Sequence, residues 1–205
     1  YWTKDWYRIE EHFANPPSDG ESLSDALSGE KLISRLVDLA HEKGIKVLLD
    51  LSFNHTSPVL QNVSLDKSKQ SDFDRQYNLE FSPVNKNGVN QTIYCRPTMT
   101  KTCGETIVSG NWFNPPYSIT DWEDPYQNEV YQLHTLADLN QRDAQVSNYL
   151  INSAKKWINL GVDGFRIDAI KHIYKDFLLE LEESLVKEKD DLILIGEYFD
   201  GGSRN

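Results

Sequence analysis

Three stretches of the chain place apolar residues at intervals of three and four, the spacing of one face of an α-helix. They span residues 30–43, 146–160 and 175–189. Glycine follows the first two stretches directly, at Gly44 and Gly161, and glycine is common just past the end of a helix. We therefore expect three helices.

Each predicted helix is followed by a short, mainly apolar run of the kind that forms a buried strand. These runs span 45–53, 162–167 and 192–195. Helix–strand repeats of this length are typical of a parallel α/β sheet. Since a closed eight-stranded barrel needs about 250 residues, three strands indicate either a small open α/β protein or an interior piece of a barrel. The abrupt ends of the chain favour the piece.

A different composition separates the first helix–strand unit from the others. Residues 56 to about 135 are rich in Asn, Ser, Pro, Gly and isolated aromatics, without a sustained period, which is typical of loops and short strands. A structureless stretch of this length is unusual in a compact domain, so we expect an insertion with a small fold of its own. The predicted organisation is a barrel part at 1–55, an insertion at 56–138 and a second barrel part at 139–205.

The charge of the chain excludes one class of partner. Its 205 residues include 32 acidic and 21 basic ones, for a formal net charge of −11. Nucleic-acid binding uses a basic surface, whereas this balance suits neutral polyhydroxylated substrates and bound cations. No apolar run reaches the roughly 18 residues of a membrane span, and the first residues lack the pattern of a signal peptide. We expect neither a nucleic-acid nor a membrane partner.

Two local patterns concern covalent chemistry. Cys95 and Cys103 lie eight positions apart in loop-like sequence; they are either a disulfide that closes a hairpin, which would indicate an oxidising compartment, or two free thiols. A zinc site needs more ligands than this pair supplies. The sequence also fits the N-glycosylation pattern at Asn54, Asn62 and Asn90.

All three predicted strands end in polar side chains. The first ends in 50–55, the second in 166–172 and the third in Glu197. In parallel α/β structures functional residues lie at the C-terminal ends of strands. Two carboxylates at the ends of successive strands, Asp168 and Glu197, are the minimum equipment for cleaving a glycosidic bond.

The neighbours of these carboxylates suggest a division of roles. Arg166 lies two positions before Asp168, so on a strand both side chains point to one face, and the guanidinium should keep Asp168 ionised, as a nucleophile requires. Glu197 follows a run of Ile and Leu, and an apolar setting should raise its pKa, as a proton donor requires. We expect Asp50 to be structural and to hold Arg166. Taken alone, these residues also fit a structural Arg–Asp pair with a solvated glutamate.

Four segments resemble signatures of the alpha-amylase family of glycoside hydrolases, in the family order and with family-like spacing. They are 50–55, 136–140, 164–172 and 196–199. The resemblance covers essentially the whole chain. It implies an α/β fold that is part of a TIM (β/α)8 barrel, about strands 3 to 5, with the insertion as the family's irregular B domain.

The resemblance also implies a function for individual residues. The chain would belong to a retaining enzyme of alpha-1,4-glucans, such as starch and maltooligosaccharides, with Asp168 as the nucleophile and Glu197 as the general acid and then base. Residues that would contact the sugar are Tyr1, His55, Arg166, Lys171 and His172. Lys171 also fits an ordinary surface lysine, and an Asn-His pair after a strand is often turn chemistry.

A calcium ion is a further implication of the resemblance. Asn54, Asp138 and His172 match positions that bind calcium in many relatives, His172 through its main-chain carbonyl. Oxygen ligands from separate segments suit Ca²⁺. A carbonyl near Glu129 would complete this frame, but its match is too weak to claim. The ion would pin the insertion against the active site; ordinary polar contacts without a metal are the alternative.

Within the family, the segments 54–58 and 137–141 are most similar to cyclodextrin glycosyltransferases and maltogenic amylases. Cyclising enzymes carry a central aromatic residue four positions before the motif aspartate, where this chain has His134, so we expect hydrolysis over cyclisation. The alternatives are a transglycosylase, or a non-catalytic carbohydrate-binding or scaffold protein that keeps the fold. The family's third carboxylate lies in a motif beyond the last residue, so we expect the 205 residues alone to be inactive. We further expect a secreted monomer.

Overall fold

The predicted helix–strand order is present in the part of the chain that the structure describes. The computed structural model describes residues 3, 6–7, 9, 29–58, 80–81, 93–94, 113–114, 117–134 and 136–199. The helices are α1 (Gly29–His41), α3 (Pro125–Val130), α4 (Ala144–Asn159), the 3-10 helix η3 (Ile170–His172) and α5 (Lys175–Val186). The strands are β1 (Leu48–Leu51), β2 (His55–Pro58), β3 (Glu80–Phe81), β4 (Ile93–Tyr94), β5 (Leu136–Asp138), β6 (Gly164–Ile167) and β7 (Ile193–Gly196).

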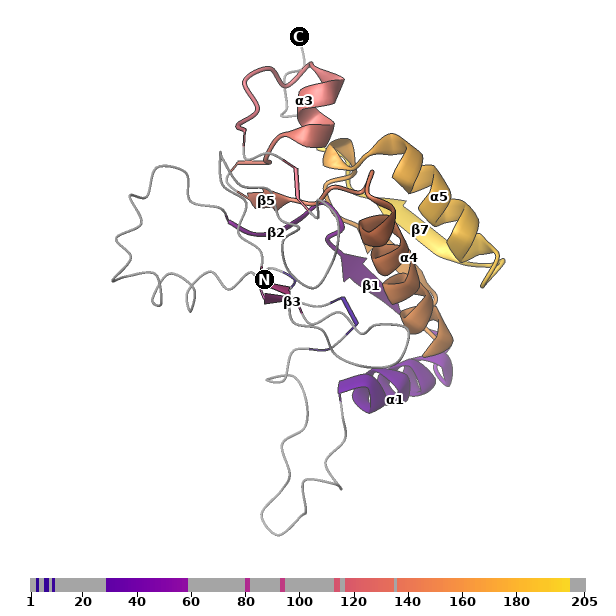
Figure 1. Cartoon of the computed structure of the whole chain (residues 1–205). Helices are drawn as coiled ribbons and strands as arrows, with labels where there is room; N and C mark the ends of the chain where they lie inside the picture. The colour runs from indigo at the N-terminus through magenta and orange to yellow at the C-terminus, as the bar shows by residue number, and fades with distance from the viewer. Residues whose placement is uncertain are drawn as a thin grey trace.

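The central element is a parallel sheet in the order β1-β6-β7. Asp50 of β1 is in register with Arg166 of β6, which is in register with Ile195 of β7. The three strands therefore end at one edge of the sheet, as the sequence predicted. In Figure 1, α1 lies at the lower end of this sheet, and α3, β2 and β5 lie at the upper end.

One apolar core joins the sheet to helices α1, α4 and α5. Its fully buried members include Val37 of α1, Leu150 of α4, Phe165 of β6, and Phe177 and Leu185 of α5. The amphipathic spacing read from the sequence supplies these positions, because residues three and four apart lie on one face of a helix. Burying this face fixes the helices and, through them, the strand ends.

Glycine is required at two places in this framework. Gly161 ends the turn after α4 with a φ of 99°, a backbone conformation that other residues adopt only with strain. A Cβ atom at Gly164 would overlap the main-chain carbonyl of Ile193 in the neighbouring strand β7. Close pairing of β6 with β7 therefore depends on the absence of a side chain at residue 164.

The first predicted strand is shorter than expected, and a loop follows it where the prediction continued the strand. The prediction covered 45–53, but β1 contains only Leu48–Leu51. The residues after β1 form a loop that includes Ser52. Trp6 Nε1, from the N-terminal part of the chain, donates a hydrogen bond to the Ser52 carbonyl at 3.1 Å. The chain then enters β2, which pairs antiparallel with β5, so that His55 faces Asp138. The two ends of the predicted insertion are thus hydrogen-bonded to each other.

Some predicted features lie outside the described residues. They are Tyr1, Cys95, Cys103, Asn62 and Asn90. Within the described part, no helix combines the length and apolar character that crossing a bilayer requires.

Candidate active site

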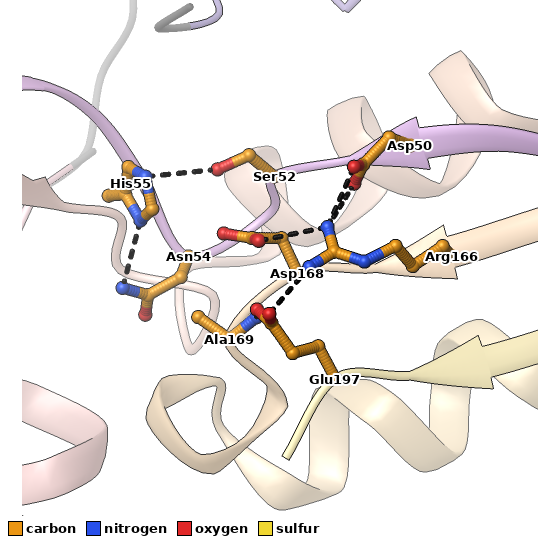
Figure 2. Close-up of polar contacts among 8 residues, drawn as sticks. All are labelled: Asp50, Ser52, Asn54, His55, Arg166, Asp168, Ala169 and Glu197. Carbon is orange, nitrogen blue, oxygen red and sulfur yellow. Dashed lines mark hydrogen bonds and ion pairs between the residues drawn. The ribbon is translucent and has the colours of Figure 1, made fainter. Parts of the chain in front are cut away.

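Three carboxylates from three neighbouring strands converge on one guanidinium (Figure 2). Arg166 Nη1 donates to both carboxylate oxygens of Asp50, at 2.7 Å each, and to Asp168 Oδ1 at 3.0 Å. Arg166 Nη2 lies 2.7 Å from Glu197 Oε1. The sequence prediction that Asp50 holds Arg166 is confirmed, and the same arginine also joins Asp168 to Glu197.

The backbone brings these side chains together. Asp168 and Glu197 are the first residues after β6 and β7, and their N–H groups donate to the carbonyls of Leu51 and Ile167, at 2.9 Å each. Ala169 has a left-handed conformation, with φ 51°, and its N–H donates to Glu197 Oε2 at 3.3 Å. The parallel ladder thus continues one residue beyond the strands and orients both acids.

The electrostatics of the two acids differ from the prediction. Burial and the nearby Glu197 carboxylate raise the pKa of Asp168, although Arg166 acts in the opposite direction. The Ala169 N–H, the interaction with Asp168 and the charge of Arg166 lower the pKa of Glu197. The predicted rise in the pKa of Glu197 is therefore wrong for this structure, first because the Ala169 N–H stabilises its carboxylate. Arg166 lowers the pKa of Asp168 as predicted, but burial outweighs it; the Asp168 side chain is 18% exposed, against 44% for Glu197.

His55, the first residue of β2, lies next to this cluster (Figure 2). Its Nε2 is 3.2 Å from Ser52 Oγ, and its Nδ1 is 3.4 Å from the Asn54 amide. Burial, with a smaller effect of His172, lowers the pKa of His55 to about 4. The ring is thus neutral near pH 7 and can donate a hydrogen bond from one nitrogen and accept one at the other.

The three predicted calcium ligands meet at one point between the insertion and the sheet. One amide atom of Asn54 lies 2.6 Å from the His172 carbonyl oxygen and 3.1 Å from Asp138 Oδ2. As an NH2 group it donates to both oxygens; as the amide oxygen it completes a set of three facing oxygens, an arrangement that a bound cation would stabilise. The donor set therefore fits a hard cation, and it equally fits an amide hydrogen bond.

Asp138 is the charged member of this cluster. It is fully buried, and burial raises its pKa well above the usual range, against the opposing effects of Asn114, Arg142 and Asn54. Asn114 Nδ2 donates to Asp138 Oδ1 at 2.6 Å. Among the described residues no group of three His, Cys, Asp or Glu side chains could hold a metal, so this candidate combines the Asp138 carboxylate with amide and carbonyl oxygens.

Two other predicted sugar contacts, His172 and Lys171, lie next to aromatic side chains. The buried His172 ring turns toward α3, with Nδ1 3.1 Å from the Asn128 carbonyl oxygen and a T-shaped contact to Trp122. Lys171 Nζ lies 6.0 Å from the centre of the Tyr198 ring. Tyr1 lies outside the described residues. Of the five predicted sugar contacts, the structure brings Arg166 into the carboxylate cluster and places His55 beside it.

Sequence reasoning missed three contributors to the site. Ser52 orients His55, the Ala169 backbone orients Glu197, and Trp122 packs on His172. Ser52 and Ala169 lie inside the recognised segments and could have been considered. Trp122 lies in the insertion, far from any motif, and no sequence pattern pointed to its contact.

The fold and the site together define an α/β protein with acidic residues at the carboxyl ends of parallel strands, the position of active sites in barrel enzymes. The alpha-amylase catalytic-domain family model matches residues 1–203. The chain belongs to this family, whose catalytic domain is a TIM barrel.

Individual relatives agree with this assignment. A cyclomaltodextrin glucanotransferase of Klebsiella oxytoca is 30% identical over 100% of this chain and 26% of its own length. An alpha-amylase of Niallia circulans is 27% identical over 98% of this chain and 31% of its own length. The chain thus spans only a quarter to a third of the length of these relatives.

Solved structures resemble the chain over nearly its full length. A cyclomaltodextrin glucanotransferase with a three-domain ABC distribution matches with a TM-score of 0.71 and 28% identity, over 100% of this chain and 34% of the other. An alpha-amylase from Geobacillus thermoleovorans, complexed with acarbose, matches with a TM-score of 0.62 and 26% identity, over 98% of this chain and 33% of the other.

Proposed function

We propose that this chain is part of a retaining glycoside hydrolase of alpha-1,4-glucans, with Asp168 as the nucleophile and Glu197 as the general acid and then base. The observation that supports this most is the guanidinium of Arg166 between these two carboxyl groups, 3.0 Å from one and 2.7 Å from the other. Retaining glycosidases use two carboxyl groups about 5–5.5 Å apart. Membership of the alpha-amylase family supports the choice of alpha-glucans such as starch.

The proposed reaction has two displacements. The Asp168 carboxylate bonds to the anomeric carbon as the glycosidic C–O bond breaks, and the Glu197 proton passes to the leaving oxygen. Glu197 then takes a proton from a water molecule, whose oxygen bonds to the anomeric carbon and releases Asp168. A sugar hydroxyl in place of this water would give transglycosylation by the same residues.

The reaction needs one proton on this pair of acids. Three carboxylates share one guanidinium, so Asp168 and Glu197 bind a proton more readily than separate acids would, and they titrate as a pair. Without substrate, the surroundings raise the pKa of Asp168 and lower that of Glu197. We propose that substrate reverses this order, because the glycosidic oxygen accepts from Glu197 while positive charge at the anomeric carbon stabilises an ionised Asp168.

Other residues would bind rather than react. A neutral His55 would form a hydrogen bond with a sugar hydroxyl, and Arg166 would position both acids. Tyr1 and Lys171 would add contacts to the glucan. His172 would contribute through its main-chain carbonyl more than through its ring, since the ring is turned toward Asn128.

We propose calcium as the occupant of the cluster formed by Asn54, Asp138 and His172. A divalent cation there would keep the buried Asp138 ionised and would favour the Asn54 orientation that presents oxygen. The ion would join the loop after β1 to β5 and η3, and thus the insertion to the sheet. Its role would be structural, with no part in bond breaking.

Product choice is a further part of the proposal. His134, at the position of the central aromatic residue of cyclising enzymes, has a φ of 58° and lies 6.1 Å from the Trp122 ring. An imidazole offers less apolar surface to a wound glucan than a phenol ring does. Hydrolysis should therefore exceed cyclisation, and mainly cyclic products from the full-length enzyme on starch would contradict this. A secreted monomer remains our expectation.

The assignment is tested in the full-length protein with Asp168→Asn and Glu197→Gln. Each should lower turnover of maltooligosaccharides by at least about a thousandfold. Glu182→Gln, on the exposed side of α5, is the matched control and should leave turnover unchanged. Wild-type turnover in either active-site variant would contradict the assignment.

A further inference from the structure

Arg142 connects the insertion to the sheet domain through two contacts. It lies in the turn between β5 and α4, and its Nη2 is 3.0 Å from Glu129 Oε2 in α3. Its guanidinium carbon lies 4.0 Å from the centre of the Tyr174 ring, at the residue before α5. One side chain therefore bridges α3 and the start of α5.

Both contacts are close enough to be attractive. The Arg142 and Glu129 side chains are 34% and 22% exposed, so water screens the ion pair less than it would on an open surface. A guanidinium within about 6 Å of a ring centre is attracted to the face of that ring. The Tyr174 hydroxyl makes its own hydrogen bond, to Asp176 Oδ2 at 2.8 Å.

A second attachment holds the same turn of α3. His172 Nδ1 lies 3.1 Å from the carbonyl oxygen of Asn128, the residue before Glu129. Asn128 Nδ2 donates to the Trp122 carbonyl at 2.9 Å, and the Trp122 ring packs against His172. The turn around Asn128 is thus attached to η3 through His172, and to α5 through Arg142.

These attachments adjoin the cluster of Asn54, Asp138 and His172. Arg142 follows Asp138 by four residues, through a turn in which Gln141 Nε2 donates to the Phe53 carbonyl at 2.9 Å. Tyr174 follows His172 by two residues. Arg142 and Tyr174 therefore lie on the same two segments that supply Asp138 and the His172 carbonyl.

We propose that Arg142 is a positioning residue: clamped between Glu129 and Tyr174, it holds the segments of Asp138 and His172 in place and thereby strengthens calcium binding. This inference rests on the calcium site proposed above. It assigns to Arg142 no contact with substrate and no part in proton transfer.

The charge of Arg142 has the opposite effect, and this makes the inference testable. A guanidinium four residues after Asp138 repels a divalent cation bound there. If charge were all that mattered, removing it would tighten calcium binding. If the clamp dominates, removing it weakens calcium binding.

The experiment measures calcium affinity of the full-length protein by isothermal titration after removal of bound metal with chelator. Arg142→Gln should weaken calcium binding about three- to tenfold. Tyr174→Leu should weaken it in the same direction without any change of charge, and Tyr174→Phe, which keeps the ring, is the matched control with wild-type affinity. Tighter binding in Arg142→Gln, or wild-type affinity in Tyr174→Leu, would overturn the inference.

A second measurement separates the clamp from the calcium site itself. In excess chelator, hydrogen–deuterium exchange of peptides that cover residues 125–131 should be faster in Arg142→Gln and Tyr174→Leu than in wild type and Tyr174→Phe. Equal exchange in all four proteins would overturn the clamp. Absence of calcium binding by the wild type would refute the proposed calcium site, and with it the effect of Arg142 on affinity, whatever the exchange result.

Discussion

Arg166 Nη1 lies 2.7 Å from each carboxylate oxygen of Asp50, across a strand pair that sets their Cα atoms in register. This pair anchors the guanidinium. The same Nη1 also contacts Asp168, and Nη2 contacts Glu197. Asp50 therefore acts on the two proposed catalytic acids through Arg166.

The first prediction concerns this anchor. Asp50→Asn removes the charge that holds Arg166, and a small displacement of a positioning group can lower turnover by about a hundredfold. We expect kcat of the full-length enzyme to fall about tenfold to a hundredfold, with little change in KM. Glu183→Gln, at an exposed acid on α5, is the control. Unchanged kcat in Asp50→Asn would show that Asp50 does not position Arg166.

The second prediction concerns acid stability at the opposite end of the sheet. Asp163 precedes β6 and is buried; it accepts from His41 Nε2 at 2.7 Å and from the Val47 N–H at 2.8 Å. Burial favours a raised pKa, but these hydrogen bonds and nearby positive charge outweigh it, and the pKa of Asp163 is lowered.

A lowered pKa stabilises the fold above the unfolded-state value of about 3.9, and the stabilisation is lost as pH falls below it. Asp163→Asn should therefore weaken the dependence of the melting temperature on pH below about 4, and reduce stability at pH 7 by about 1–3 kcal/mol. Melting curves of the full-length protein between pH 3 and pH 7 test this. An unchanged slope below pH 4 would contradict it.

The third prediction concerns the metal. Binding to the folded state alone stabilises it by about 2.7 kcal/mol when free calcium is a hundred times Kd. Chelator should therefore lower the melting temperature of the full-length protein, and added calcium should restore it. Asp138→Asn should abolish this response, because the site loses its only carboxylate. Melting that ignores chelator in the wild type would count against the site.

The fourth prediction separates steric overlap from backbone strain at two glycines. Gly164→Ala places a methyl group against the Ile193 carbonyl and should destabilise by about 2–4 kcal/mol. Gly44→Ala meets no atom within 4 Å but has a φ of 70°, so it should destabilise by only about 1 kcal/mol. Denaturant unfolding measures both, and equal losses would argue against the overlap.

The sequence predicted the backbone elements better than it predicted the contacts and protonation of the side chains. Helix α4 and strand β7 lie within two residues of their predicted bounds, because amphipathic period and terminal glycines act locally. The placement of Asp50, Arg166, Asp168 and Glu197 followed from one rule, that parallel strands end together. This much of the site could be predicted without a structure.

Protonation and long-range contacts could not be predicted from the sequence. The pKa order of Asp168 and Glu197 depends on exposure and on the left-handed Ala169, neither of which a motif encodes. The contacts of Trp122 with His172 and of Arg142 with Tyr174 join segments whose approach depends on how the insertion folds. Such pairs follow from tertiary packing, which local patterns do not specify.

The central claim is that Asp168 attacks the anomeric carbon. It is tested most directly by treating the full-length Glu197→Gln variant with an activated alpha-maltosyl fluoride, which needs no acid to leave, and locating the trapped sugar by mass spectrometry of the peptides. We predict one maltosyl group covalently bound to Asp168, and none in the double variant that also carries Asp168→Asn. A trapped sugar on another residue, or release of product with inverted configuration and no trapped sugar, would contradict the claim.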